Sequence, residues 1–428
     1  MIFGTLPGGA PVELFELSSD KLTVRISNYG GRIISVVKDG MDMIVGPKHF
    51  EDMLKDTCYC GAICGRVANR IAKGRFSIDG DSRTVAVNNG PNHLHGGIQG
   101  FDSKVWQVQE AGRNTLVLTL HSADGEENYP GNLEVVATYT VVEETLHLRL
   151  EAYADAATIV NLTNHAYWNL SGKPTIDSMT LEVRASAYTP VDATNIPDGR
   201  ILPVEGTDFD LRKAALLGER NSAAHPDTAA GLDHNYVLDS EPGDKIAAIL
   251  LDPESRHRLI VATDAPGLQV YTGEYLPQAR QGIALEAQGF PNAVNTPPLP
   301  QRHSASRPIR HAQHYLDCQI GGMPESRFRT KNGASTTPAA GFPVQARGIR
   351  RPRKALPPLP FGALPRCVPG NGLQKPDPQR KPDCPDIAQA SRQMPPSGTP
   401  HAPPNPPAQG QAPPEPPRPR RKQPYSQP

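Results

Sequence analysis

The sequence predicts an all-β protein, a large antiparallel β-sandwich in residues 1–297, followed by a disordered tail rich in proline and arginine. Three observations support this fold class. Apolar and polar residues alternate with period two from about Val12 to Asn295, as in strands with one buried face. Gly, Asn, Asp and Pro interrupt the alternation at short intervals, as turns between strands do. Helical signals are weak, and a single large β-sandwich can exceed the usual domain length.

The individual strands follow from this alternation. Leu22, Val24 and Ile26 alternate with polar neighbours, and the Asn-Tyr-Gly-Gly segment at 28–31 then turns the chain into a second strand. The same pattern predicts strands at 33–37, 115–121, 133–142, 145–153 and 283–287. The segment Leu211–Leu217 is the one place where we expect a short helix.

The tail differs from the rest of the chain in both charge and proline content. The 428 residues carry 44 Lys and Arg and 44 Asp and Glu, yet residues 298–428 carry 20 and 6 of these, a net charge of +14. They also contain 30 of the 46 prolines, which break helices and cannot donate to a sheet. We therefore expect a disordered basic tail. An SH3-type ligand or a nucleic-acid arm is the functional alternative, but such patterns arise easily from composition, so no nucleic-acid partner is expected.

Hydropathy and cysteine content bear on the compartment. A mean hydropathy of −0.46 and the lack of an apolar run near twenty residues argue against a membrane span. The N-terminus has no secretory signal pattern, so we expect a cytoplasmic protein.

The clustered Cys58, Cys60 and Cys64 lack a second Cys or His pair at zinc-site spacing, and we interpret them as apolar strand residues, with no metal site.

The candidate catalytic residues are polar side chains within strand-like or turn segments. The fingerprints of P-loop, zincin, α/β-hydrolase and dinucleotide-binding proteins are absent. Glu286 lies between Leu285 and Ala287 in a short apolar strand, so its side chain points the opposite way from both, into a cavity or solvent. In a cleft, burial would raise its pKa and make it a base usable near neutral pH. Taken singly, each candidate histidine is more often a core or surface group than a catalyst.

Other residue types suggest what such a site would bind. Tyr167 and Trp168 offer flat faces for the apolar side of a pyranose ring, and Asn, Arg, Asp and Gln supply directed hydrogen bonds to hydroxyl groups. The set suits proton transfer on a sugar without a cofactor.

Six segments resemble the aldose 1-epimerase family, the galactose mutarotases, in the family's order and approximate spacing. They are GRVANRIAKGRFSIDG, NHLHGG, NLTNHAYWNLSG, GLDHNYVL, GLQVYTGEYL and IALEAQGFPNAVN. The resemblance spans nearly all of residues 1–297, and the combination is specific although each motif alone is weak. It implies the galactose-mutarotase type of β-sandwich, and interconversion of the α and β anomers of free aldohexoses such as galactose and glucose.

The resemblance also implies residue roles. Glu286 matches the general base that takes the proton of the anomeric hydroxyl, and His165 matches the general acid that protonates the ring oxygen. His95 matches a second imidazole near the ring oxygen and C1. The residues that match groups gripping the sugar hydroxyls are Asn69, Arg70, Asp233 and Gln269.

After Pro297 the chain departs from the family, which continues with a His-Phe-Pro-Asn segment and a last apolar strand. A shift of one nucleotide in the possible codons permits such a segment here, and permits Ile-Trp-Ile-Val over Tyr315 to Cys318. The hypothesis is that residues 298–428 are a frame-shifted translation. We then expect the domain to lack its closing strand, with an exposed edge.

Two alternatives to a free-sugar epimerase stay open. A hexose-6-phosphate mutarotase would need additional cationic side chains near the sixth carbon of the sugar. A non-catalytic sugar-binding protein of the same fold would have no need for both Glu286 and His165. We expect a small aldose as the binding partner, no membrane partner, and a monomer or homodimer.

Overall fold

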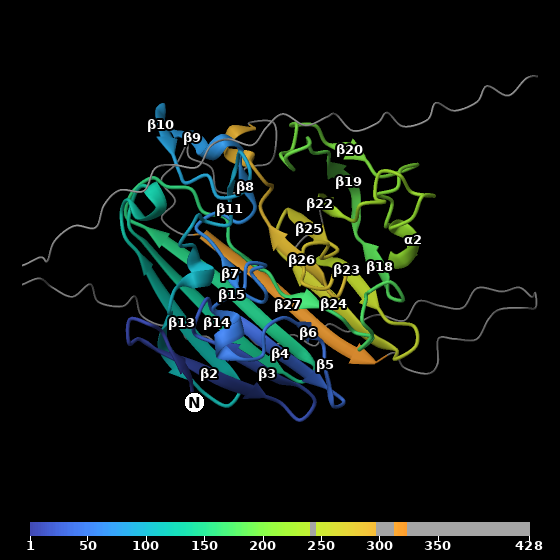
Figure 1. The fold of residues 1–428 in the computed structure, drawn as a ribbon, viewed down its shortest axis with the longest axis horizontal. Helices are drawn as coiled ribbons and strands as arrows, with labels where there is room; N and C mark the ends of the chain where they lie inside the picture. The colour runs from blue at the N-terminus through green and yellow to red at the C-terminus, as the bar shows by residue number, and fades with distance from the viewer. Residues whose placement is uncertain (240–244, 297–311, 323–428) are drawn as a thin grey trace, which may run out of the picture. The chain divides into compact units, whose positions relative to one another are not determined.

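The structure is a computed structural model that describes residues 1–239, 245–296 and 312–322 (Figure 1). Within these residues, strands dominate and helices are single turns, which confirms the predicted all-β class. The largest sheet has nine antiparallel strands. In sheet order they are β12 (Gln107–Ala111), β13 (Thr115–Ser122), β14 (Leu133–Val142), β15 (Thr145–Ala154), β27 (Ala312–Gly322), β24 (His257–Thr263), β23 (Lys245–Leu251), β18 (Thr180–Val183) and β21 (Ala215–Leu216).

Two further sheets of the described residues have seven and five strands. The seven-stranded sheet has the order β20 (Leu202–Pro203), β19 (Ala185–Thr189), β22 (Asp233–Leu238), β25 (Gly267–Tyr271), β26 (Ile283–Gln288), β17 (Tyr167–Trp168) and β6 (Ile44–Val45). The five-stranded sheet has the order β1 (Ile2–Thr5), β2 (Pro11–Ser18), β3 (Thr23–Ser27), β4 (Arg32–Lys38) and β5 (Met41–Asp42).

Short elements complete the fold. Three antiparallel pairs are β10 (Asp81–Thr84) with β9 (Arg75–Ile78), β11 (His93–Leu94) with β8 (Arg70–Ile71), and β16 (Thr163–Asn164) with β7 (Ile63–Cys64). The α-helices are α1 (Phe50–Met53) and α2 (Leu217–Arg220). No helix in the described part of the chain has the length and apolar character needed to cross a bilayer.

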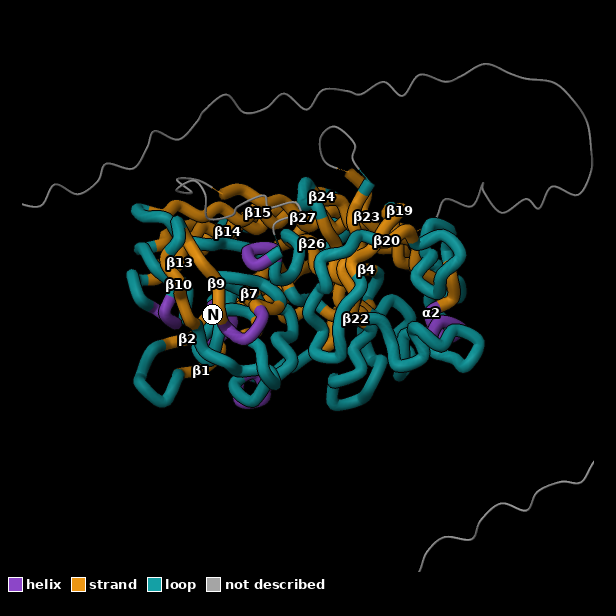
Figure 2. The backbone as a smooth tube through the Cα atoms, turned by 90° about the horizontal axis from the view of Figure 1, so that it is seen from above, coloured by secondary structure: helices purple, strands orange, loops and turns teal. Residues whose placement is uncertain are grey.

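The main hydrophobic core lies between the nine-stranded sheet and the other two, as a sandwich requires. Every second residue of β13 is buried, among them Leu116 and Leu118, and these pack in one cluster with Ile26 of β3 and Leu285 of β26. Seen from above, β14, β15, β27 and β24 run along one edge of the molecule, and β4, β7 and β22 lie further in, towards the middle of the view (Figure 2). The strands predicted by alternation are therefore present because this alternation buries one face of each.

The structure differs from the prediction of a missing closing strand. Residues 312–322 form β27, which pairs antiparallel with β15 on one side and β24 on the other (Figure 1). Leu316 pairs in register with Leu148 and with Thr263, so the backbone groups of both neighbouring strands find partners. The expected exposed edge is thus closed, and the described β-sandwich extends past residue 297. The remainder of the predicted tail, 298–311 and 323–428, lies outside the described residues.

The predicted helix at Leu211–Leu217 is also wrong. Ala215 and Leu216 pair with β18 as the edge strand β21, and the single-turn helix α2 begins only at Leu217. Apolar spacing in so short a segment cannot nucleate a helix by itself, and pairing with a sheet edge decides its conformation.

Candidate active site

Glu286 lies on β26, a strand whose six residues are all buried. Leu285 and Ala287 point into the main core, and Glu286 points the other way and lines a cavity of about 180 Å³. Its side chain is only 2% exposed. The alternation of a strand therefore delivers one carboxylate to the cavity from an otherwise apolar strand, as the sequence predicts.

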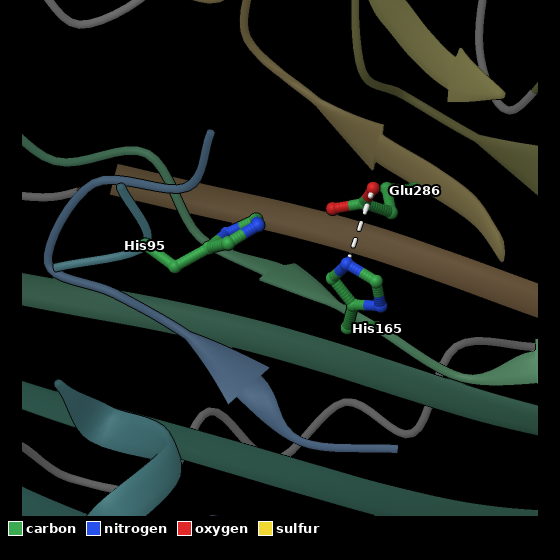
Figure 3. Close-up of side chains that lie close together, drawn as sticks. All are labelled: His95, His165 and Glu286. Carbon is green, nitrogen blue, oxygen red and sulfur yellow. Dashed lines mark ion pairs between the residues drawn. The ribbon is translucent and has the colours of Figure 1, made fainter. Parts of the chain in front are cut away.

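His165 lies between β16 and β17, and backbone hydrogen bonds hold it on both sides. The N–H of His165 donates to the carbonyl of Ala62 at 2.9 Å, and the N–H of Gly61 donates to the carbonyl of His165 at 2.9 Å. The imidazole Nε2 lies 3.6 Å from Oε1 of Glu286, on β26 (Figure 3). The two groups are therefore close neighbours, but 3.6 Å is too long for a hydrogen bond.

His95 follows β11 and has its ring orientation set by Asn69. The backbone N–H of Asn69 donates to Nδ1 of His95 at 3.2 Å, and the N–H of His95 donates to the carbonyl of Asn69 at 3.1 Å. Because Nδ1 accepts, the proton of the neutral ring sits on Nε2. His95, His165 and Glu286 converge in space although nearly 200 residues separate the first from the last (Figure 3).

Asp233 on β22 joins the polar residues at the cavity wall. It accepts hydrogen bonds from Gln269 Nε2 at 2.6 Å and from Asn195 Nδ2 at 3.0 Å. Arg70 Nη1 lies 3.6 Å from the same carboxylate, and Arg70 Nε donates to Asn89 Oδ1 at 3.0 Å. Asp233 and Arg70 line the cavity directly, whereas Gln269 is held behind Asp233 and is the cross-strand partner of Glu286.

Of the two aromatic residues predicted to face a sugar, the structure places only Tyr167 in the cavity wall. Its ring lies 5.0 Å from the His165 ring. Trp168 belongs to the main hydrophobic core, so the prediction for this residue is wrong. Neighbouring residues of a strand point to opposite faces, and only one of an adjacent pair can line the cavity.

Burial shifts the pKa values of all three converging groups towards their neutral forms. Desolvation lowers the pKa of His165 to about 4 and lowers that of His95 well below 6.5. Desolvation, reinforced by the charge of Asp233 and opposed by Arg70, raises the pKa of Glu286 well above 4.5. Burial therefore favours the neutral forms of both His165 and Glu286 and opposes a standing ion pair between them.

Several buried polar atoms near the cavity have no hydrogen-bond partner among the described residues. They include Nδ1 of His165, Oε2 of Glu286 and Oε1 of Gln269. Leaving a buried polar atom unpaired typically costs about 1–3 kcal/mol, so such atoms are rare in protein interiors. Two of these atoms, on His165 and Glu286, belong to residues that line the cavity, as a site that binds a polar molecule would require.

The three groups could also be considered as a metal site, since their ligand atoms lie within 4.8 Å of one another. The hydrogen bond from Asn69 argues against this, because it occupies Nδ1 of His95 and leaves Nε2 protonated. A metal ion would have to displace that proton or break the hydrogen bond. Cys60 and Cys64 are buried free thiols whose pKa values burial raises, as apolar groups would be placed. Only Cys64 lies in a strand, β7, whereas Cys58 and Cys60 lie in the loop before it and Cys58 is half-buried, so the strand prediction is wrong for these two.

Sequence reasoning missed further residues of the cavity wall: Thr57, Cys58, Tyr59, Asn89, Leu94, Tyr271 and Tyr275. Tyr271 and Tyr275 lie in the GLQVYTGEYL segment, and Asn89 lies close before NHLHGG. Arg66, in the GRVANR segment, is a structural anchor. Its buried guanidinium donates to the carbonyls of Ser122, Ala123, Pro130 and Gly131.

Comparisons with known proteins agree with this fold. The family model described as aldose 1-epimerase matches residues 13–310. The galactose mutarotase of Sus scrofa is 42% identical over 318 residues, covering 70% of this chain and 92% of that protein. The aldose 1-epimerase of Escherichia coli (strain K12) is 32% identical over 325 residues, covering 71% and 93%.

Solved structures give the same result. The GalM/aldose epimerase homologue from C. elegans matches with a TM-score of 0.68 at 26% identity, covering 73% of this chain and 100% of that one. Galactose 1-epimerase from Lactobacillus acidophilus matches with a TM-score of 0.66 at 29% identity, covering 75% and 98%. With the matched family model spanning most of its length, this chain belongs to the aldose 1-epimerase family.

Proposed function

We propose that this enzyme interconverts the α and β anomers of free aldohexoses such as galactose and glucose. The observation that carries the proposal is the approach of Nε2 of His165 to within 3.6 Å of Oε1 of Glu286, in a cavity lined by amide, guanidinium and carboxylate groups. Opening a hemiacetal requires one group to remove a proton and another to deliver one at the same anomeric centre. The galactose mutarotase and aldose 1-epimerase relatives support this activity.

The chemical step follows from these two groups. Glu286 takes the proton of the anomeric hydroxyl, His165 gives a proton to the ring oxygen, and the bond between C1 and the ring oxygen breaks to leave a free aldehyde. After rotation about C1–C2, the transfers reverse: the hydroxyl returns its proton to His165 as it attacks C1, and the carbonyl oxygen takes the proton back from Glu286. Acid and base groups typically each contribute about 10² to 10⁴ in rate.

The proton count of the pair explains how buried neutral groups can do this work. A protonated Glu286 with neutral His165 has the same total charge as an ionised Glu286 with a protonated His165. Burial favours the first arrangement. A sugar hydroxyl that donates to the carboxylate and a ring oxygen that accepts from the imidazole favour the second, which is the arrangement that reacts.

The remaining residues bind and orient the sugar in this proposal. His95 presents a proton on Nε2, because Nδ1 accepts from Asn69, and it therefore acts as a fixed donor near the reacting oxygens. Asp233 and Arg70 hold sugar hydroxyls, and Gln269 orients Asp233 from behind. Tyr167 supplies a flat apolar face beside His165.

The charge of the cavity favours a neutral sugar over a sugar phosphate. Among the described residues that line it, Arg70 is the one Lys or Arg, and its guanidinium already contacts Asp233 and Asn89. A phosphate dianion would be held by free cations, commonly by bidentate arginine.

Polarimetry of freshly dissolved α-D-galactose tests the function. We expect mutarotation faster than in buffer alone and proportional to enzyme concentration. Saturable galactose binding without acceleration would instead establish the non-catalytic sugar-binding alternative. Acceleration with glucose 6-phosphate but not with free glucose would establish the sugar-phosphate alternative.

We further propose that the enzyme works in the cytoplasm as a monomer or homodimer, without a metal ion. Free thiols at Cys58, Cys60 and Cys64 support a reducing compartment. Cell fractionation, and light scattering of the purified protein, test the location and the oligomeric state. We expect activity to persist after dialysis against a chelator, because the proposed mechanism uses no metal ion.

We also propose that residues 298–428 derive from a shifted reading frame. The segment for which the shifted codons permit an apolar strand, 315–318, coincides with part of β27 between β15 and β24. Sequencing the gene around the codons for Thr296 and Pro297 tests this. An intact frame with no nearby insertion or deletion would reject it.

A further inference from the structure

A buried ion pair lies next to the site and has no part in the proton transfers described above. Arg32 and Asp56 form it, with side chains 2% and 4% exposed. Arg32 Nη1 also donates to the carbonyl of Cys60 at 3.0 Å, and Nη2 donates to the carbonyl of Asp102 at 3.2 Å. A buried pair of this kind adds little stability compared with apolar side chains, which suggests a positional role.

The ion pair organises the loop that carries Tyr59. The Asp56 carboxylate accepts from the N–H of Cys58 at 3.0 Å and from the N–H of Cys60 at 2.8 Å. The loop therefore winds around one carboxylate, and Tyr59, between the two donors, has a φ of 58°. A left-handed conformation is unusual for a bulky residue and persists only where the surroundings enforce it.

The ring of Tyr59 lies beside both imidazoles of the site and is tilted relative to each. Its centroid is 4.6 Å from that of His95 and 6.0 Å from that of His165. The next residues of the same loop bond directly to the segment of His165, through the Gly61 and Ala62 backbone and through Asn164 Nδ2, which donates to the Gly61 carbonyl at 2.8 Å. One loop thus fixes the backbone of His165 and contacts the side chains of both histidines.

We propose that Tyr59 is a positioning residue for mutarotation, which holds the imidazoles of His95 and His165 in place and keeps water away from them. This rests on the proposed roles of those two histidines. The hydroxyl group of Tyr59 has no hydrogen bond to the other described residues, so the aromatic ring is the part that acts. The Arg32–Asp56 pair acts through Tyr59 by fixing its loop.

The expected effect on titration follows from the surroundings of His165. The titratable groups in contact with it are Glu286 on β26, His95 after β11, Tyr167 on β17 and Tyr59 in the loop. Charged groups that act on it from neighbouring elements are Asp233 on β22, Asp56 in the loop and Arg32 on β4. Desolvation is the largest cause of the lowered pKa of His165, about 4. Removing the ring of Tyr59 admits water on one side, so the pKa of His165 should rise towards 6.5 while the other groups stay in place.

Tyr59→Ala, Tyr59→Phe and the control Tyr153→Ala test the proposal. For Tyr59→Ala we expect kcat to fall at least tenfold with a smaller change in KM, and the acidic limb of the pH profile to move by one unit or more to higher pH. Tyr59→Phe should restore both, because it keeps the ring. Tyr153 is half exposed on β15, away from the cavity, and its replacement should change neither.

Titration of the His165 ring by NMR gives a readout that does not depend on turnover. A higher pKa in Tyr59→Ala than in the wild type supports the proposal. An unchanged pKa and pH profile, with or without a fall in kcat, would overturn it. Failure of the proposed function would look different: the wild-type protein itself would not accelerate mutarotation, whatever the NMR titration of the Tyr59 variants shows.

Discussion

Replacing Glu286 by Gln is the sharpest test of the proposed chemistry. Glutamine keeps the size of the side chain and can still form hydrogen bonds, but its amide cannot accept the proton of the anomeric hydroxyl. A general base typically contributes about 10² to 10⁴ in rate, or about 2.7 to 5.5 kcal/mol of the barrier. Since the side chain is only 2% exposed, bulk water has little access to replace it, and we expect a loss of about 10³-fold or more in kcat.

The same substitution should stabilise the fold at neutral and alkaline pH. Because burial raises the pKa of Glu286 well above 4.5, the native state holds a proton that the unfolded state releases. This contribution to the free energy of unfolding is full below about pH 4.5 and is lost as pH rises through the native pKa, by at most about 1.4 kcal/mol per pH unit for one group. Glutamine removes this loss, and His165 is present in both proteins, so its effect cancels.

The assay has two parts. Polarimetry with α-D-galactose gives kcat, and denaturant unfolding between pH 5 and 8 gives the difference in stability between Glu286→Gln and the wild type. The expected result is an inactive variant whose relative stability increases with pH. A variant that keeps more than a tenth of the wild-type kcat, or a stability difference that does not vary with pH, would refute the assignment of Glu286 as a buried base.

Three further predictions concern the acid, the sugar contacts and the closing strand. Since the pKa of His165 is lowered to about 4, kcat/KM should stay nearly constant from pH 7 to 5 and fall near pH 4; a limb near 6.5 would contradict the neutral buried imidazole. Asp233→Asn removes a carboxylate contacted by Gln269, Asn195 and Arg70, and losing charged hydrogen bonds of about 1.5–3 kcal/mol should raise KM about 10- to 100-fold with a smaller effect on kcat. A chain ending at residue 322 should unfold cooperatively and be active. A chain ending at residue 296 should show neither cooperative unfolding nor activity, because it lacks β27 between β15 and β24. Equal melting curves for the two chains would show that β27 adds no stability.

Local sequence rules predicted much of the β-sandwich, and they failed where partners distant in sequence decide the outcome. Alternation identified β3, β13, β14 and β15 because one face of each strand enters the core. It could not place Ala215 and Leu216, whose conformation depends on an edge of β18 more than thirty residues earlier. It also gave no sign that residues 312–322 would lie between two strands of the largest sheet.

The amino-acid sequence by itself determined which groups could do the chemistry. Strand alternation turned Glu286 away from the core, and the six motifs identified the family and, with it, His165, His95, Arg70 and Asp233 as candidate site residues. Residue identity and period suffice for this, because they are local properties of the chain.

Only the tertiary structure decided how those groups behave. It brought Glu286 within 3.6 Å of His165, assigned the proton of His95 through the N–H of Asn69, and set Tyr59 beside both imidazoles. Distance, tautomer and desolvation depend on what packs around a side chain, and these surroundings come from segments that the folded chain alone brings together.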